Sequence, residues 1–241
     1  MLKLAGGHRP LPLAPDARAL GLALLLIASG SWFASTASAQ TDHTFESWTA
    51  ALLQMRLDPK AEQSPALWLD LHTRRGEGRS TFLVRPGFGW HLHSAVSLWA
   101  GYLWNPTLID GAANRVEHRP WQQLQISLPG PSVSFLLRSR FEQRWVEGNG
   151  TAGFRARQLA RAQLRVTDDW AAVLWDEIFV ALNDTPWGQS SGLDQNRLFL
   201  GAAWMPVHHV RIEPGYLMVW IPRTTGDTIA HALSLNFFVT H

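Results

Sequence analysis

The sequence lacks cysteine, and this excludes a disulfide framework. Beyond residue 39 it also lacks any apolar run approaching the roughly 20 residues that a membrane-spanning helix requires. No segment of useful length repeats its apolar residues with a helical period, and no nucleic-acid-binding motif is recognisable. The absence of helical periodicity favours an all-β protein.

The first 39 residues have the pattern of a secretory signal peptide. Lys3, Arg9 and Arg18 form a basic leader, residues 20–27 are uninterruptedly apolar, and residues 37–39 (Ala-Ser-Ala) form a small-residue cleavage site. A membrane anchor is the alternative, but this apolar run falls well short of the ~20 residues of a spanning helix. We therefore expect cleavage after residue 39 and a single mature domain over residues 40–241.

Charge is balanced once the leader is removed. Subtracting Lys3, Arg9, Arg18 and Asp16 from the 21 basic and 19 acidic residues leaves 18 of each, so no nucleic-acid partner is expected. Lys60 is the only lysine beyond residue 39, and the other basic residues there are arginines. Arginine suits dense internal pairing because its planar fork holds a carboxylate through two hydrogen bonds. A high genomic G+C content would produce the same bias.

Period-two patterning divides the mature chain into about eleven extended segments. Most reach the roughly 9 to 11 residues of a tilted membrane strand, whereas globular strands more often stop at about 5 or 6. From the third segment onward short and long connections alternate, which is typical of outer-membrane barrels and puts the C-terminus on the periplasmic side. The predicted segments are 45–57, 66–74, 80–92, 95–104, 115–128, 132–146, 154–166, 170–183, 195–205, 208–221 and 229–240.

An odd number of strands conflicts with the even number found in single-chain bacterial barrels. Either segment 45–57 is not a membrane strand, which gives ten, or two strands have been merged, which gives twelve. The fold class predicted is a single antiparallel up-and-down transmembrane β-barrel of about 10–12 strands with a charged Arg/Glu interior.

Segment 132–146 separates apolar from charged residues most clearly. One face carries Val133, Phe135, Leu137 and Phe141, and the other carries Arg138, Arg140, Glu142 and Arg144. A soluble β-sandwich turns its charges to water, whereas a membrane barrel turns them into its lumen. Near the midplane each arginine would cost ~2–4 kcal/mol if it faced lipid, so we expect the charges to face inward.

Tryptophans near the predicted strand ends are typical of interfacial girdles: Trp90, Trp104, Trp145, Trp170, Trp204 and Trp220. Three others fall on the predicted inner face: Trp99, Trp121 and Trp175.

Several strings, in order over nearly all of the mature chain, resemble one bacterial family: Gly101-Tyr102, 117–124 (EHRPWQQL), 138–145 (RSRFEQRW), 176–183 (DEIFVALN), 194–197 (DQNR) and Gly215-Tyr216. This family is catalogued as domain of unknown function 2490. The resemblance implies an outer-membrane barrel without a defined activity, and it supplies no catalytic residues. Such barrels usually end on an aromatic residue read by the barrel assembly machinery, whereas this chain ends Phe-Phe-Val-Thr-His at residues 237–241.

The charged inner face is the candidate site, a lumen charge network on neighbouring strands. Small barrels pack their interiors with side chains, so a salt-bridged plug is favoured over an open pore. The arginine excess keeps a narrow, anion-preferring conduit as the other reading. The members are Glu117, Arg119, Arg138, Arg140, Glu142, Arg144, Arg155, Arg157, Arg161, Glu177, Arg197, Arg211 and Glu213.

Other chemistry is less well supported. His91 and His93 share a strand face, but zinc normally needs three or four ligands, and no metal or other cofactor is predicted. An outer-membrane enzyme acting on lipid or lipopolysaccharide is an alternative that would need a serine near a histidine. The candidates are His72, His118 and His231 with Ser97, Ser134 and Ser234, and nothing in the sequence selects a triad among them.

A soluble periplasmic β-barrel that binds a small apolar ligand is a further alternative, and it would turn its apolar residues inward. For the membrane barrel the expected partners are outer-membrane lipid, the barrel assembly machinery and small anionic solutes. We expect a monomer.

Overall fold

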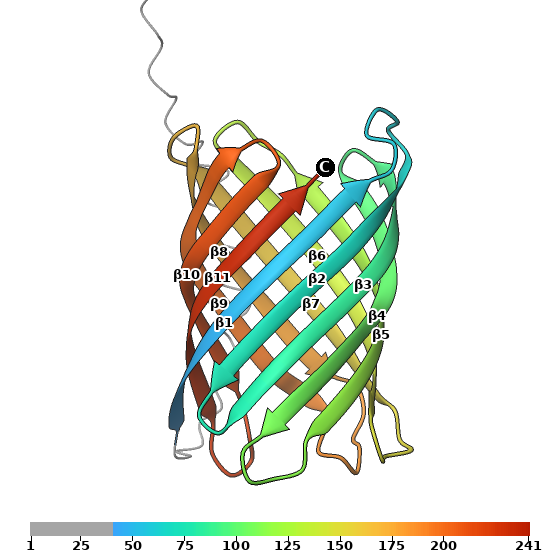
Figure 1. The fold of residues 1–241 in the computed structure, drawn as a ribbon, viewed down its shortest axis with the longest axis vertical. Coiled ribbons are helices and arrows are strands. Elements are labelled where there is room, and N and C mark those ends of the chain that lie inside the picture. Colours follow the sequence, from blue (N-terminus) through green and yellow to red (C-terminus); the bar gives the residue numbers. More distant parts are fainter. Residues whose placement is uncertain (1–40) are drawn as a thin grey trace, which may run out of the picture.

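The computed structural model describes residues 41–241, and the predicted signal peptide lies outside them. Eleven strands form a single closed barrel (Figure 1). They are β1 (Asp42–Arg56), β2 (Ser64–Gly76), β3 (Arg79–His93), β4 (Val96–Ile109), β5 (Arg115–Leu128), β6 (Val133–Val146), β7 (Gly153–Arg165), β8 (Trp170–Ala181), β9 (Gly192–Val207), β10 (Val210–Ile221) and β11 (Thr228–Thr240). Residues 41–241 contain no helix long and apolar enough to cross a membrane.

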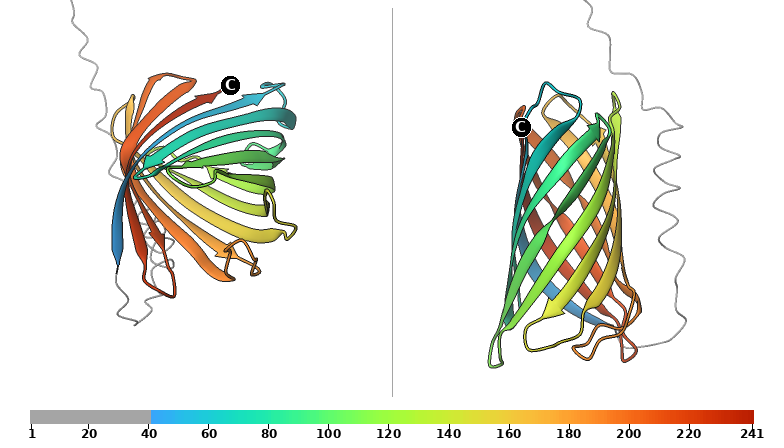
Figure 2. Two further views of the ribbon diagram at one scale, coloured as in Figure 1. Left: turned by 60° about the horizontal axis from the view of Figure 1, so that its bottom comes forward. Right: turned by 90° about the vertical axis from the view of Figure 1, so that its right-hand side faces the viewer.

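The barrel closes through a parallel strand pair. Consecutive strands are antiparallel, so the first and the eleventh run in the same direction, and they pair from Asp42↔Thr228 to Gln54↔Thr240. The count of eleven is therefore correct, and the expectation of ten or twelve is wrong. An even number is required only when the closing pair is antiparallel. Two further views show the tilted strands as one continuous wall (Figure 2).

Each predicted segment corresponds to one strand. The largest error is in β4, which was expected to end at residue 104 because Asn105 and Pro106 resemble turn residues. The strand continues to Ile109, Pro106 stays in register with Val116, and Asn105 is buried in the lumen.

Short and long connections alternate from β3 onward, as predicted. The end that holds the C-terminus has the turns 94–95, 129–132, 166–169 and 208–209. The opposite end has the loops 110–114, 147–152, 182–191 and 222–227. We call these the short-turn end and the long-loop end. The β1–β2 connection, residues 57–63, lies at the short-turn end and is longer than its neighbours there (Figure 1).

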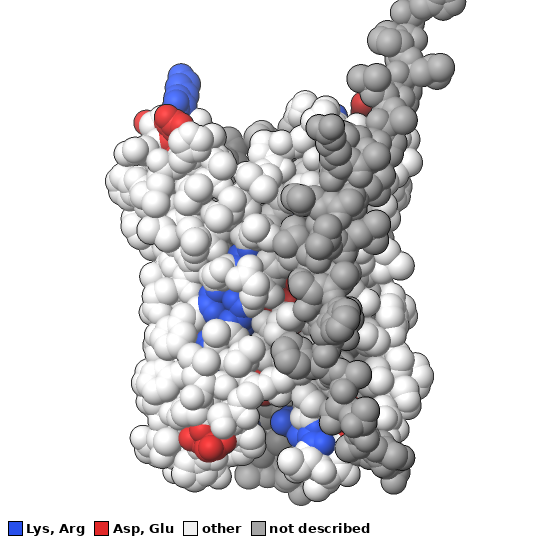
Figure 3. Space-filling model, turned by 180° about the vertical axis from the view of Figure 1, so that it is seen from behind, with Lys and Arg blue, Asp and Glu red and all other residues white. Residues whose placement is uncertain are grey.

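Large apolar side chains cover the outside of the barrel, and arginines and carboxylates lie inside. Outward Leu200 and Leu233 are 62% and 77% exposed, whereas inward Glu142 is 1% exposed. On the described surface of one face, charged residues form only small patches (Figure 3). Five of the predicted girdle tryptophans are exposed: Trp90, Trp104, Trp145, Trp170 and Trp204. Trp220 is half-buried, and its indole N–H donates to Asp227.

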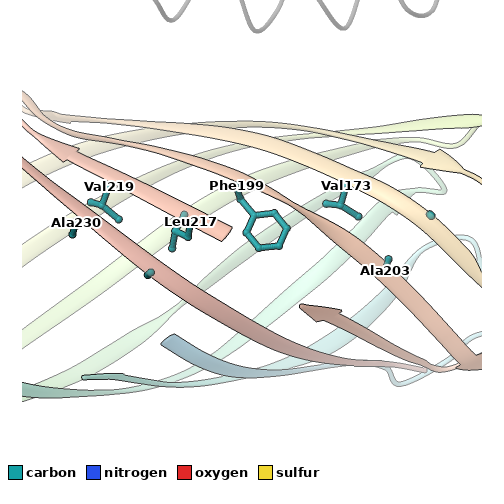
Figure 4. Close-up of a cluster of buried hydrophobic side chains, with 8 residues drawn as sticks. Val173, Phe199, Ala203, Leu217, Val219 and Ala230 are labelled. Carbon is teal, nitrogen blue, oxygen red and sulfur yellow. The ribbon is translucent and has the colours of Figure 1, made fainter. Parts of the chain in front are cut away.

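The lumen also contains two apolar clusters. One lies between β8 and β11 and is centred on Phe199 (Figure 4). The other consists of Ala66, Trp68, Leu83, Trp99, Leu103 and Trp121. In each cluster a large ring packs on a glycine: a Cβ at Gly101 would lie 2.6 Å from the Trp121 ring, and one at Gly215 would lie 2.4 Å from the Phe199 ring. Only glycine therefore allows these rings to approach the wall so closely.

Candidate functional site: the charged lumen

A continuous chain of alternating charges crosses the inner face of β5–β9. At its centre Glu142 accepts hydrogen bonds from Arg155, at 2.5 and 3.0 Å, and from Arg157 at 2.6 Å. Arg157 also donates to Glu177 at 2.8 Å, and Arg138 donates to the same carboxylate at 2.8 Å. Each central carboxylate is therefore shared by two guanidinium groups.

The chain continues toward the long-loop end through Asp194. Arg155 donates to Asp194 at 2.8 Å, and Arg144 lies 3.9 Å from the same carboxylate. Arg144 and Arg119 both donate to Glu117, at 2.6 and 2.7 Å. Because a buried ion is costly unless it is paired and hydrogen-bonded, this sharing is what allows so many charges inside the barrel.

Two smaller groups lie nearer the short-turn end. Glu213 accepts from Arg161 at 2.5 and 2.9 Å and lies 2.6 Å from Arg211. Asp70 accepts from Arg85 at 2.5 Å and lies 2.5 Å from the Nε2 atom of His72.

The predicted site residues fall into three sets. Glu117, Arg119, Arg138, Glu142, Arg144, Arg155, Arg157 and Glu177 belong to the long chain of ion pairs. Arg161, Arg211 and Glu213 form the second group. Arg140 and Arg197 face the lumen without an ion pair to any described carboxylate: Arg140 donates to Gln123, and Arg197 donates to Gln195 at 3.3 Å.

Asp194 was not predicted as a lumen residue because a β-bulge changes the direction of its side chain. Strict alternation with Arg197 would point it outward, but the register of β8 and β9 shifts between Phe179↔Gln195 and Val180↔Leu193. This shift turns Asp194 toward Arg155. Asp70, Arg74 and Arg85 were also missed as site residues, although in β2 the alternation of outward leucines with inward polar residues is visible in the sequence.

Side chains divide the lumen into two cavities. The cavity toward the short-turn end has a volume of about 350 Å³, and its walls include Asp70, Arg138 and Glu213. The cavity toward the long-loop end has a volume of about 380 Å³, and its walls include Glu117 and Asp194. Trp48, Arg74 and Arg197 line both cavities and therefore mark their junction.

Polar side chains also occur on the outer wall, where each pairs with a neighbour on the next strand. Gln143 donates to Gln122 at 2.8 Å and Ser139 donates to Gln158 at 2.5 Å. Asn196 donates to both oxygens of Asp176, at 2.9 and 3.1 Å. These polar pairs on β5 to β9 differ from the uniformly apolar outer face that the alternation predicts.

The candidate catalytic histidines do not contact the candidate serines among the hydrogen bonds of residues 41–241. His72 lies inside against Asp70. His118 faces outward, where it shares hydrogen bonds with Tyr102 and, at 3.0 Å, with Glu147. His231 also faces outward, 2.5 Å from the hydroxyl of Tyr216 and 2.9 Å from His43.

A string with the spacing of a nucleophile elbow, Gly-Gln-Ser-Ser-Gly at residues 188–192, lies in the β8–β9 loop and the first residue of β9. A nucleophile elbow instead connects a strand to a helix. The central serine of the string is Ser190, and the residue after it, Ser191, donates its backbone N–H and its hydroxyl to Asp184. The string therefore does not form an elbow.

The two histidines considered as metal ligands have separate partners. His91 packs edge-on against Trp99, with ring centroids 5.7 Å apart, and His93 lies 3.3 Å from Glu62. Within the described part of the chain no group of three or more His, Cys, Asp or Glu side chains is arranged to hold a metal ion.

Comparison with known proteins identifies relatives of this chain and the family that it matches. An uncharacterized protein of Methylorubrum extorquens is 34% identical over 186 residues, which cover 73% of this chain and 81% of that protein. The solved structure of the NanC porin aligns with a TM-score of 0.47 at 9% identity and covers 76% of this chain and 89% of that one. Residues 45–230 match a family described as a protein of unknown function, DUF2490, the family that the ordered strings resemble, and the chain therefore belongs to it.

Proposed function

We propose that this protein is an outer-membrane barrel whose lumen is plugged by ion pairs, and that the narrow path around this plug prefers small anions. The observation that carries the proposal is the direction of the side chains. Exposed apolar residues cover the outer wall, and nearly all of the buried charges lie inside. A water-soluble barrel has the reverse arrangement, whereas a transmembrane barrel requires this one.

The apolar outer surface supports residence in a membrane. Soluble monomers rarely expose contiguous apolar patches larger than a few hundred Å². Here the outward leucines, phenylalanines and tryptophans extend over strands all around the barrel, including Leu69 on β2, Phe88 on β3, Phe141 on β6 and Leu200 on β9. The alternative of a soluble periplasmic barrel requires apolar residues turned inward, so this surface argues against it.

The contents of the lumen support a plug. Barrels of 16 to 18 strands leave an aqueous channel, whereas barrels of about 8 are filled by side chains. This barrel has eleven strands, and the ion-paired side chains leave cavities of only about 350 and 380 Å³. The inward arginines outnumber the inward carboxylates, and Arg74, Arg140 and Arg197 have no carboxylate partner among the described residues. A surplus of positive charge lowers the barrier for anions.

Membrane residence is tested by fractionating cells and by comparing the gel migration of heated and unheated samples. The expected result is recovery in the outer membrane, with a folded form that migrates differently until it is boiled. Recovery in the soluble periplasmic fraction would contradict the proposed location.

The conduit is tested in planar lipid bilayers that hold a salt gradient. We expect a small conductance, well below that of an open porin, and a reversal potential that favours chloride over potassium. Arg138→Ser, which removes a cation from the wall of the short-turn cavity, should weaken the anion preference. Arg75→Ser, on the exposed outer face of β2, is the control and should leave it unchanged. A large conductance or a preference for cations would refute this function.

A further inference from the structure

The junction between the two cavities is formed by a tryptophan and two arginines from three strands. Trp48 comes from β1, Arg74 from β2 and Arg197 from β9. The guanidinium carbon of Arg74 lies 4.0 Å from the centroid of the Trp48 ring, and that of Arg197 lies 5.0 Å from it. Trp48 is itself held in place, because its indole N–H donates to Glu46 at 2.6 Å.

Both arginines keep unused hydrogen-bonding capacity. Neither forms an ion pair with a described carboxylate, and the Nε atom of each is buried without a hydrogen-bond acceptor. Arg197 is only 8% exposed and has a single side-chain acceptor, Gln195. Arg197 also lies over the ring of Phe179, at 4.3 Å from its centroid. The two cations that face Trp48 repel each other, and each contact with an aromatic ring compensates only about 0.5–2 kcal/mol.

The neighbouring carboxylates are already engaged. Glu46 accepts from Trp48 and from Arg79, at 2.6 and 3.2 Å. Glu177 is shared by Arg138 and Arg157. Neither carboxylate forms an ion pair with Arg74 or Arg197, so an anion bound at the junction would supply a negative charge that these two arginines lack in direct contact.

We propose that Arg74 and Arg197 bind a small oxyanion, the carboxylate or phosphate group of a solute, at the junction of the two lumen cavities. The planar fork of arginine matches both groups, because it offers parallel N–H donors to two oxygens. The inference rests on the proposed function in one respect, since the junction is where an anion crossing the lumen would pause.

The long-loop cavity provides a positively charged approach to this junction. Its walls include Arg115 and Arg223, which form no ion pair with a described carboxylate. Arg115 instead lies over the ring of Trp187, at 5.3 Å from the centroid. Positive groups along a low-dielectric cleft raise the local concentration of anions. The approach and the junction therefore favour the same class of solute.

The test is a binding measurement that does not depend on conductance. The purified, refolded mature barrel in a non-ionic detergent is titrated by calorimetry with inorganic phosphate and, separately, with acetate at constant ionic strength. We expect saturable binding of at least one probe with one site per barrel. The probe that binds assigns the oxyanion: phosphate alone indicates a phosphoryl group, and acetate indicates a carboxylate.

The variants Arg74→Gln and Arg197→Gln should each weaken binding by roughly tenfold to a hundredfold, the usual effect of losing hydrogen bonds to a charged group. Arg75→Gln removes the same charge from the adjacent exposed position of β2 and should bind as the unmodified barrel does. Folding of every variant is checked by heat-modifiable migration. If the glutamine variants do not fold, Arg74→Lys and Arg197→Lys keep the charge, lose the fork and should bind more weakly.

Failure to bind either probe would overturn the inference, as would equal affinity in the Arg74, Arg197 and Arg75 variants. Conductance separates this inference from the proposed function. If the barrel binds phosphate but passes no anions, the binding site is supported and the conduit is refuted. If the barrel passes anions without saturable binding, the conduit is supported and the binding site is refuted.

Discussion

Replacing Glu142 by glutamine is expected to destabilise the barrel by about 3 kcal/mol, because the carboxylate holds two buried cations. Its side chain is 1% exposed and accepts hydrogen bonds from Arg155 and Arg157 at distances between 2.5 and 3.0 Å. Removing one partner of a buried pair typically costs 3–5 kcal/mol. The lower end of this range applies, because Arg155 retains Asp194 and Arg157 retains Glu177.

The assay is equilibrium unfolding in urea from lipid vesicles, followed by tryptophan fluorescence. Glu147→Gln is the matched control: this glutamate has 60% of its side chain exposed and pairs only with His118 at the surface. An exposed pair contributes about 0–1 kcal/mol, so the control should change the free energy of unfolding by no more than that. If Glu142→Gln costs no more than Glu147→Gln, the ion-pair chain does not stabilise the lumen and the reasoning fails.

Three further perturbations test other parts of the structure. Replacing Asp176 and Asn196 together by leucine should stabilise the barrel in lipid by roughly 1–2 kcal/mol, because in the proposed membrane location the outward carboxylate and its partner would face lipid chains. A loss of stability in vesicles would contradict that placement of this face. Gly101→Ala should lower the free energy of unfolding by about 1–3 kcal/mol, because the new Cβ would lie 2.3 Å from the carbonyl oxygen of Pro86. Gly150→Ala is the control: its Cβ meets open space, so it should lower the free energy of unfolding by less than about 0.5 kcal/mol. Equal unfolding midpoints for the two variants would refute the close packing at Gly101. Because the chain has no cysteine, Ala113→Cys in a long loop and Ala95→Cys in a short turn can report orientation with a membrane-impermeant maleimide, and labelling of position 95 but not 113 in intact cells would reverse the predicted topology.

The facing of the strands could be predicted from the sequence because a single residue of slippage exchanges the two faces. In β6 and β7 the arginines alternate so regularly with apolar residues that only one register is affordable in lipid. The same regularity located all eleven strands, including β1, which the even-number rule cast into doubt. That rule failed because it assumes an antiparallel closing pair, and nothing local in the sequence encodes which strands close the barrel.

The pairing of individual charges could not be predicted. Glu142 bonds to arginines on the adjacent strand β7, but Arg144 reaches back to Glu117 on β5 and toward Asp194 on β9. These choices depend on strand tilt and on the β9 bulge, both of which are properties of the closed barrel. Whether an arginine ends up paired, as Arg157 does, or unpaired, as Arg197 does, is therefore visible only in three dimensions.

The parallel seam between β1 and β11 also limits how this chain could be rearranged. The start of β1 and the end of β11 lie at opposite rims of the cylinder (Figure 1). A short linker could not join them, because it would have to run the full height of the wall or thread a lumen filled with ion-paired side chains. Circular permutants, which are readily designed for barrels whose first and last strands meet at one rim, are consequently excluded for this topology unless a strand is added or removed.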